Sequence, residues 1–230
     1  MKSQRSLVYR HVVHRYDPAR RRLAISLAAL AGFIDAVGFV EAGGYFVSFM
    51  SGNTTRLGVD LATDPRSALL PLGLIASFTF GAFLGALAAE SRPQRRKSLA
   101  LGIATLLLLL ANLLQLTSGG IWFLGACALA MGALNNAFSR EGQVQIGVTY
   151  LTGALVRLAQ GVAQRLRGQD ARRHDGYGAL WLGLALGSIA GAATFAVNDS
   201  IGLQMAAAAA LALLIVAARI EQAPDTKSDL

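Results

Sequence analysis

The chain has 230 residues, of which 54% are apolar and only 15% are charged, and its formal net charge at pH 7 is +8. A soluble domain of this length usually carries about 25% charged residues, so the composition excludes an ordinary soluble domain and indicates a multi-span membrane protein. The positive charge does not indicate nucleic-acid binding, because the basic residues form short blocks beside apolar segments, as they do at the cytoplasmic flanks of membrane spans.

Eight apolar segments follow one another along the chain, and each one near 20 residues long can cross a hydrocarbon core of about 30 Å. We expect them at residues 23–42, 46–62, 67–90, 99–116, 121–142, 147–166, 177–197 and 201–220. A basic region before an apolar stretch also resembles a signal peptide. However, Asp35 interrupts the stretch, so we expect it to remain in the mature protein as the first span.

Asp35 is the most informative residue of the first segment. At 1.5 Å per residue it lies about 18 Å along the span, near the middle of the bilayer. An ionisable side chain at that depth is costly unless it is paired, and it indicates a functional site by default. We expect Arg56, in the second segment, to be its partner.

The second segment begins with the polar run SGNTTR, residues 51–56. A Gly-Gly pair lets the chain turn before it, and we expect Ser51, Asn53 and Thr54 to cap a helix that starts near residue 52. Irregular backbone at membrane depth is tolerated only where it is packed in protein or lines a wet cavity. The run therefore marks either a ligand path or a buried hydrogen-bonded joint, since the same residue types make ordinary helix contacts in lipid.

The second half of the sequence repeats the first at an offset of about 100 residues. Asp35 lies over Asn135, and with one residue added Arg56 lies over Arg157. We expect Arg157 to pair with the neutral Asn135 or Asn136 as Arg56 pairs with Asp35. One residue further, two stripes of small residues match: Ser77, Gly81, Gly85 and Ala89 lie over Ala179, Gly183, Gly187 and Gly191. The shared order indicates a duplication.

The basic blocks select a topology for these repeats. If all eight segments cross, the block RPQRRK, residues 92–97, lies outside, against the positive-inside tendency. If the second and sixth segments dip in and return, 19 of the 21 Lys and Arg lie inside, and only Arg56 and Arg66 do not. We therefore predict an all-α polytopic membrane helix bundle of two inverted repeats, 23–116 and 121–220, each with three spans plus one short broken or re-entrant helix.

In this reading a single membrane domain, 23–220, is flanked by a basic cytoplasmic tail, 1–22, and a cytoplasmic C-terminal tail, 221–230. Eight full crossings, the alternative, would give parallel repeats. Inverted repeats with discontinuous helices are typical of secondary transporters, which bind their solute near the midplane between the repeats.

The candidate solute-binding residues are the polar residues of the two broken helices and the residues expected beside them. They are Asp35, Ser51, Asn53, Thr54, Thr55, Arg56, Asn135, Thr152 and Arg157. The structural alternative is a buried salt bridge between Asp35 and Arg56 that only fixes one helix against another.

Nothing in the sequence indicates an enzyme. Ser51 or Thr54 would need an activating base to act as a nucleophile, but His11, His14 and His174, the three histidines, lie outside the spans. No acidic cluster or HExxH run indicates a metal. We therefore expect no catalytic residue, metal or cofactor, and we expect the lipid bilayer as partner, with a homodimer through the small-residue faces as a further option.

The run GFIDAVGFVEAGGYFVSFMSGNTTRLGVDLA, residues 32–62, resembles the YoaK-like family of bacterial integral membrane proteins. The phrases GFIDAVGF and SFMSGNTTRLG carry most of the resemblance, and the spacing of apolar segments fits over residues 23–220. The resemblance implies a small inner-membrane protein of a domain-of-unknown-function family with about six spans, and it assigns no residue a role.

The duplication, the two polar broken helices and the buried charge together favour a transporter or channel-like permease for a small polar or anionic solute. A non-transporting membrane scaffold or assembly partner is the alternative, for which the glycine faces would be dimer surfaces.

Overall fold

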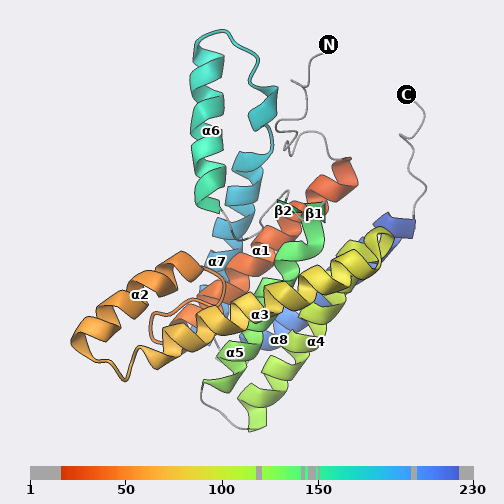
Figure 1. The fold of residues 1–230 in the computed structure, drawn as a ribbon. Helices are drawn as coiled ribbons and strands as arrows, with labels where there is room; N and C mark the ends of the chain where they lie inside the picture. The colour runs from red at the N-terminus through yellow and green to blue at the C-terminus, as the bar shows by residue number, and fades with distance from the viewer. Residues whose placement is uncertain are drawn as a thin grey trace, which may run out of the picture.

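The computed structural model describes residues 17–117, 121–140, 143, 144, 149, 151–197 and 201–222. These residues form eight α-helices, drawn in Figure 1. The helices are α1 (Pro18–Glu41), α2 (Met50–Thr63), α3 (Leu69–Ser91), α4 (Arg96–Thr117), α5 (Trp122–Leu134), α6 (Leu151–Leu166), α7 (Tyr177–Val197) and α8 (Ile201–Gln222). Short 3-10 helices η2 (Pro93–Arg95), η3 (Asn135–Phe138) and η4 (Arg172–His174) and a hairpin of two-residue strands, β1 (Ser139–Arg140) and β2 (Gln143–Val144), lie between them.

Five helices are long and apolar enough to cross a membrane: α1, α3, α4 with its preceding η2, α7 and α8. A sixth apolar element, Trp122–Phe138, combines α5 with η3 and is shorter. Neither α2 nor α6 is a candidate span. The prediction of an all-α membrane helix bundle is confirmed at this level.

The first span begins earlier than its apolar stretch. Helix α1 starts at Pro18, and proline is well suited to the first turn because its missing N–H has no partner there anyway. The last residues of the predicted basic tail are therefore helical. After Glu41 the chain turns through Gly43 and Gly44, whose φ angles of +64° and +102° favour glycine.

The fifth segment was predicted to run to residue 142, but the α-helix ends at Leu134 and a 3-10 turn follows. Two asparagines explain the early end. The amide of Asn135 donates to the carbonyl of Met131 at 2.9 Å, and that of Asn136 donates to the carbonyl of Gly132 at 3.5 Å. Asparagine side chains compete with backbone N–H groups for such carbonyls, so they favour helix ends.

Two helix crossings form the interior, α1 against α7 and α3 against α5, and both use glycine to bring backbones together. A Cβ atom built on Gly187 of α7 would lie 2.7 Å from the carbonyl carbon of Ala29 in α1. One built on Gly81 of α3 would lie 2.7 Å from the carbonyl carbon of Leu129 in α5. Only a residue without a side chain permits such approach, as at small-residue helix interfaces in membranes.

The glycine contacts correct one detail of the predicted repeat. Gly81 meets Leu129 as Gly187 meets Ala29, and Gly85 meets Ala133 as Gly191 meets Phe33. Gly81 therefore corresponds to Gly187 and Gly85 to Gly191, one helical turn away from the alignment that the sequence suggested. These stripes are also covered within the chain, so a homodimer would have to use another surface.

The remaining helices pack around this interior. Helix α4 packs on α5 and α8, α2 packs on α3, and α6 packs on α7. In Figure 1, α6 rises at the top with the start of α7, whereas α2 projects at the lower left with the start of α3. The exposed leucines of α4 form an apolar outer surface typical of lipid contact: Leu106, Leu109, Leu110, Leu113 and Leu116.

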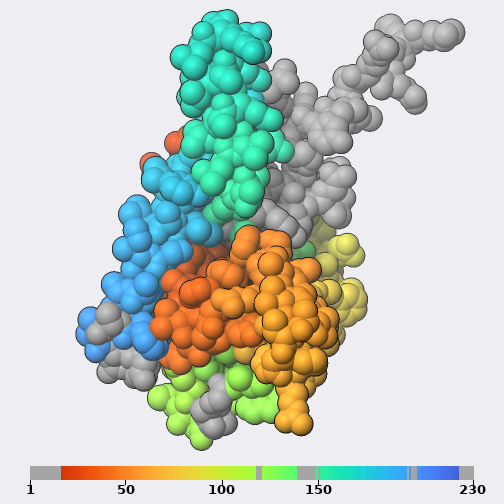
Figure 2. Space-filling model, turned by 90° about the vertical axis from the view of Figure 1, so that its left-hand side faces the viewer, coloured from red at the N-terminus to blue at the C-terminus, as the bar shows by residue number. Residues whose placement is uncertain are grey.

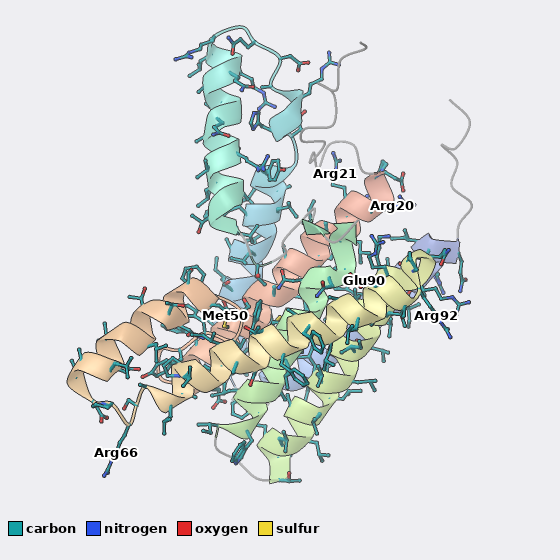
Figure 3. All side chains as sticks on the ribbon, in the orientation of Figure 1. Arg20, Arg21, Met50, Arg66, Glu90 and Arg92 are labelled. Atoms are coloured by element: carbon teal, nitrogen blue, oxygen red, sulfur yellow. The ribbon has the colours of Figure 1, made fainter. Side chains whose placement is uncertain are left out.

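Charged side chains gather at one end of the bundle. Figure 3 shows Arg20 and Arg21 of α1, and Glu90 and Arg92 at the end of α3, toward the same end of the view, whereas Arg66 lies at the far end of the α2–α3 pair. At the same charged end, Glu221 of α8 accepts hydrogen bonds from the N–H groups of Lys97 and Ser98, at 2.6 and 3.1 Å, and thereby caps the start of α4.

Candidate solute site between the starts of α2 and α6

Asp35 joins the first span to the start of α2 through two backbone amides. Its Oδ1 atom accepts hydrogen bonds from the N–H groups of Val47 and Ser48, both at 2.9 Å. These residues come directly before the helix, where the helix dipole favours a negative charge. The predicted ion pair between Asp35 and Arg56 does not form among the described residues, because the amides of the loop reach Asp35 instead.

Asn53 holds the same loop from the other side. Its side chain is fully buried, accepts from the N–H of Phe46 at 2.9 Å and donates to the carbonyl of Phe46 at 2.6 Å. The predicted capping role is wrong: α2 begins at Met50, its N-cap residue is Phe49, and no side chain caps it. Asn53 therefore fixes the path of the loop. No side chain among the described residues accepts a hydrogen bond from the first-turn amides of α2.

Thr54 and Thr55 were predicted beside the solute, but their hydroxyl groups bond back to their own helix. Thr54 Oγ1 donates to the carbonyl of Met50 at 2.9 Å, and Thr55 Oγ1 donates to the carbonyl of Ser51 at 3.3 Å. Both threonines lie on the exposed side of α2.

Asn135 has a related position in the second half of the chain. Its Oδ1 atom accepts from the hydroxyl of Thr149 at 3.2 Å, just before α6 begins at Leu151. Asn136, next to it, donates to the carbonyl of Ala82 in α3 at 2.9 Å. A polar side chain from α1 thus binds the segment before α2, and one that follows α5 binds the segment before α6.

A pocket of about 330 Å³ lies where these two segments meet. It is lined by the residues that start α2 and α6 together with one phenylalanine of α3: Ser48, Phe49, Met50, Ser51, Thr149, Leu151, Thr152, Gly153 and Phe78. Figure 3 places Met50 at the inner end of α2, toward the crossing of α1 and α7. Figure 2 shows α2 in orange and α6 in blue-green on the same face of the molecule, with α6 above α2.

The pocket presents donors rather than charged side chains. The first-turn amides of a helix have no partner within the helix, and they carry a partial positive charge. Ser48, Ser51, Thr149 and Thr152 add hydroxyl groups, and the lining residues within the described part of the chain include no carboxylate or cation. This chemistry suits a small polar or anionic solute. No cluster of metal-ligating side chains occurs among the residues whose placement is described.

The two arginines lie over tyrosine rings, outside the pocket lining. The Arg56 guanidinium carbon is 5.5 Å from the centre of the Tyr45 ring, and that of Arg157 is 5.1 Å from the centre of the Tyr177 ring. The Tyr45 hydroxyl donates to Asp60 Oδ2 at 2.9 Å, and this bond raises the pKa of Tyr45, which lies in the loop between α1 and α2. The expected pairing of Arg157 with Asn135 or Asn136 is therefore also absent.

Comparison with known proteins now places the chain in a family. The family described as "Protein of unknown function (DUF1275)" matches residues 23–218. The chain belongs to the DUF1275 family. It is also 34% identical over 207 residues to a UPF0700 transmembrane protein of Rhizobium meliloti (strain 1021), an alignment that covers 87% of this chain and 90% of the relative. No solved structure matches it significantly.

The resemblance to the YoaK-like family is thereby confirmed, and the protein is a transmembrane member of DUF1275. Within this DUF1275 chain the predicted site residues divide into three groups. Ser51 and Thr152 line the pocket, Asp35, Asn53 and Asn135 hold the segments that form it, and Thr54, Thr55, Arg56 and Arg157 point elsewhere.

Sequence reasoning missed two lining residues of this DUF1275 chain, Ser48 and Thr149. Both come just before a broken helix, and each bonds to the polar residue of its own half, Asp35 or Asn135. The signal was present in the sequence, because the same one-residue shift that matched Arg56 to Arg157 also matches Ser48 to Thr149.

Proposed function

We propose that the protein is a transporter or channel-like permease for a small polar or anionic solute, and that the pocket between the starts of α2 and α6 is its solute site. The observation that carries the proposal is the pocket itself. Two short helices that are not candidate spans begin at one cavity, the start of α2 has no side-chain cap, and four hydroxyl-bearing residues line the cavity: Ser48, Ser51, Thr149 and Thr152. Non-helical backbone inside a membrane bundle is tolerated where it lines such a cavity.

We further propose six crossings in two inverted repeats, with α2 and α6 as the broken helices. The glycine contacts support this arrangement. A Cβ atom built on Gly32 would lie 3.0 Å from the carbonyl carbon of Leu184, and one built on Gly132 would lie 3.0 Å from that of Phe78. The crossing of α1 with α7 therefore matches the crossing of α5 with α3, contact by contact. Equivalent residues are 100 positions apart in α1 and α5 and 106 positions apart in α3 and α7.

Charge supports an orientation with both termini in the cytoplasm of a bacterial inner membrane. With six crossings, 19 of the 21 Lys and Arg fall on one side, as the positive-inside tendency requires. Arg66, which Figure 3 shows far from Arg20 and Arg92, falls on the other.

A non-transporting scaffold is the second candidate, and a specific observation favours it. Asp35, Asn53 and Asn135 all find backbone or hydroxyl partners, as the residues of a purely structural joint would. An enzyme is the least favoured class, since the hydroxyl groups of the pocket have no histidine, carboxylate or lysine beside them among the described lining residues to activate them.

Osmotic swelling of proteoliposomes tests the proposal. Vesicles are placed in isotonic potassium chloride, nitrate, formate, acetate or phosphate with valinomycin, or in glycerol or urea without it, and light scattering reports solute entry. We expect swelling in at least one of these solutes, and we expect Ser51→Trp, which fills the pocket, to abolish it. Thr63→Trp, an exposed position about three turns further along the same helix and on a different face, is the matched control and should swell like the unchanged protein.

Correctly folded protein that admits none of these solutes would favour the scaffold. Equal loss of swelling in Ser51→Trp and Thr63→Trp would place the solute path elsewhere.

A further inference from the structure

The two halves of the site differ in one chemically important way. Asp35 holds the segment before α2 with a group that can ionise, whereas Asn135 holds the segment before α6 with a neutral amide. A carboxylate is not needed to hold the segment before α2, since the oxygen of a side-chain amide accepts hydrogen bonds as well. A carboxylate within a spanning helix is costly and needs a reason.

Within the described part of the chain, no cation forms an ion pair with Asp35. Helix α1, which carries Asp35, packs against α5, α7 and α8, and the loop that leads into α2 binds the Asp35 side chain. Their titratable and charged side chains, with those of α2, are Cys127, Tyr177, Arg219, Glu221, Tyr45, Arg56 and Asp60. Among the described residues, the hydrogen bonds of Asp35 come from the 47–48 loop, and none of these side chains forms an ion pair with it.

Asp35 also lies directly behind the pocket. Ser48, whose N–H it binds, is a lining residue, and Phe49, Met50 and Ser51 continue the lining from there. A negative charge at Asp35 therefore acts on any anion in the pocket, and it engages the two amides that precede α2.

We propose that Asp35 is a proton-binding site coupled to the pocket, so that a proton on Asp35 and a small anion in the pocket bind together. This inference rests on the proposed function of the pocket as a solute site. A proton from a hydronium ion adds to the carboxylate: an O–H bond of the hydronium breaks, an O–H bond forms on Asp35, and water and a neutral acid remain. Two changes follow: the repulsion on an incoming anion disappears, and the amides of Val47 and Ser48 lose a charged acceptor.

Both changes increase the affinity of the pocket for an anion. Hydrogen bonds to a charged acceptor are about twice as strong as those to a neutral one, so protonation frees the amides before α2 for a negative solute. By linkage, an anion that binds better when Asp35 is protonated raises the proton affinity of Asp35 by the same factor. The permease would then move the anion together with a proton.

Thiol labelling in the pocket tests this inference without knowledge of the natural solute. Cys127, the single cysteine, is replaced by Ala, and Ser51→Cys places a thiol in the lining. The labelling rates of an anionic and a cationic methanethiosulfonate reagent are measured in nanodiscs between pH 5 and 9. Their ratio cancels the ionisation of the thiol, because both reagents attack the same sulfur.

We expect the ratio of anionic to cationic labelling to rise on the order of tenfold as the pH falls and Asp35 gains a proton. Asp35→Asn, which copies the residue of the second half, should give a high ratio at every pH. A flat ratio in the parent protein overturns the inference, and so does an unchanged pH dependence in Asp35→Asn.

If Asp35→Asn does not fold, Asp35→Glu takes its place. A longer carboxylate keeps the titration but moves the charge, so the midpoint should shift, and an unchanged midpoint overturns the inference. The labelling assay tests the proton site and the swelling assay tests the permease, so a negative result in one does not decide the other. Solute entry with a flat ratio removes the proton site and leaves the permease, whereas a pH-dependent ratio without entry of any solute removes the permease alone.

Discussion

Gly81 offers a sharp test of the helix crossings. In Gly81→Ala the new methyl carbon would overlap the carbonyl oxygen of Leu129 and lie 2.7 Å from its carbonyl carbon, 2.8 Å from its Cα. All three atoms belong to the backbone, so no side-chain rotation relieves the overlap, and α3 must move away from α5. Overpacking of this kind costs about 1–3 kcal/mol, and we expect the upper half of that range.

Alanine also stabilises a helix by about 1 kcal/mol relative to glycine, and this gain must be subtracted. The net loss is then on the order of 1–2 kcal/mol, which corresponds to a drop of about 2–8 °C in melting temperature for a chain of this size. Gly73→Ala is the matched control, because Gly73 lies on the same helix, is exposed, and has no atom within 4 Å of its built Cβ. It should melt at or above the temperature of the parent protein.

Cys127 supplies the assay. It is a free, buried cysteine, so a fluorogenic thiol reagent added to the purified protein in detergent reports unfolding as the thiol becomes accessible. If Gly81→Ala melted as high as Gly73→Ala, the close approach of α3 and α5 at Leu129 would be refuted, and the correspondence of Gly81 with Gly187 would fall with it.

Two further predictions concern topology and the joint before α2. With Cys127 replaced by Ala, a cysteine at Ser67 should react with a membrane-impermeant thiol reagent added to intact cells, and one at Gln94 should not; labelling at Gln94 would contradict six crossings. Asn53→Ala removes two hydrogen bonds and leaves the half-buried N–H and C=O groups of Phe46 without these partners, so it should cost about 1–3 kcal/mol and lower the melting temperature. Thr54→Ala, one residue away and exposed, should change it little, and equal losses in both would show that Asn53 does not hold the loop.

The sequence by itself determined where the helices are and which two are unusual. The expected segments 67–90, 99–116, 177–197 and 201–220 each agree with a helix to within three residues at either end. This succeeded because the length and apolarity of a spanning helix are properties of the segment alone, set by the thickness of the hydrocarbon core. The polar content of 46–62 and 147–166 likewise distinguished α2 and α6 without any knowledge of their neighbours.

The tertiary structure alone decided which groups meet. Charge complementarity suggested Arg56 as the partner of Asp35, but the path of the loop brings the amides of Val47 and Ser48 to the carboxylate first. Similarly, the stripes of small residues were recognisable, yet a shift by one helical turn preserves a small-residue face, so the sequence could not fix which glycine of α7 corresponds to Gly81. Hydropathy is a local property, whereas the partner of a buried polar group depends on how separate segments pack.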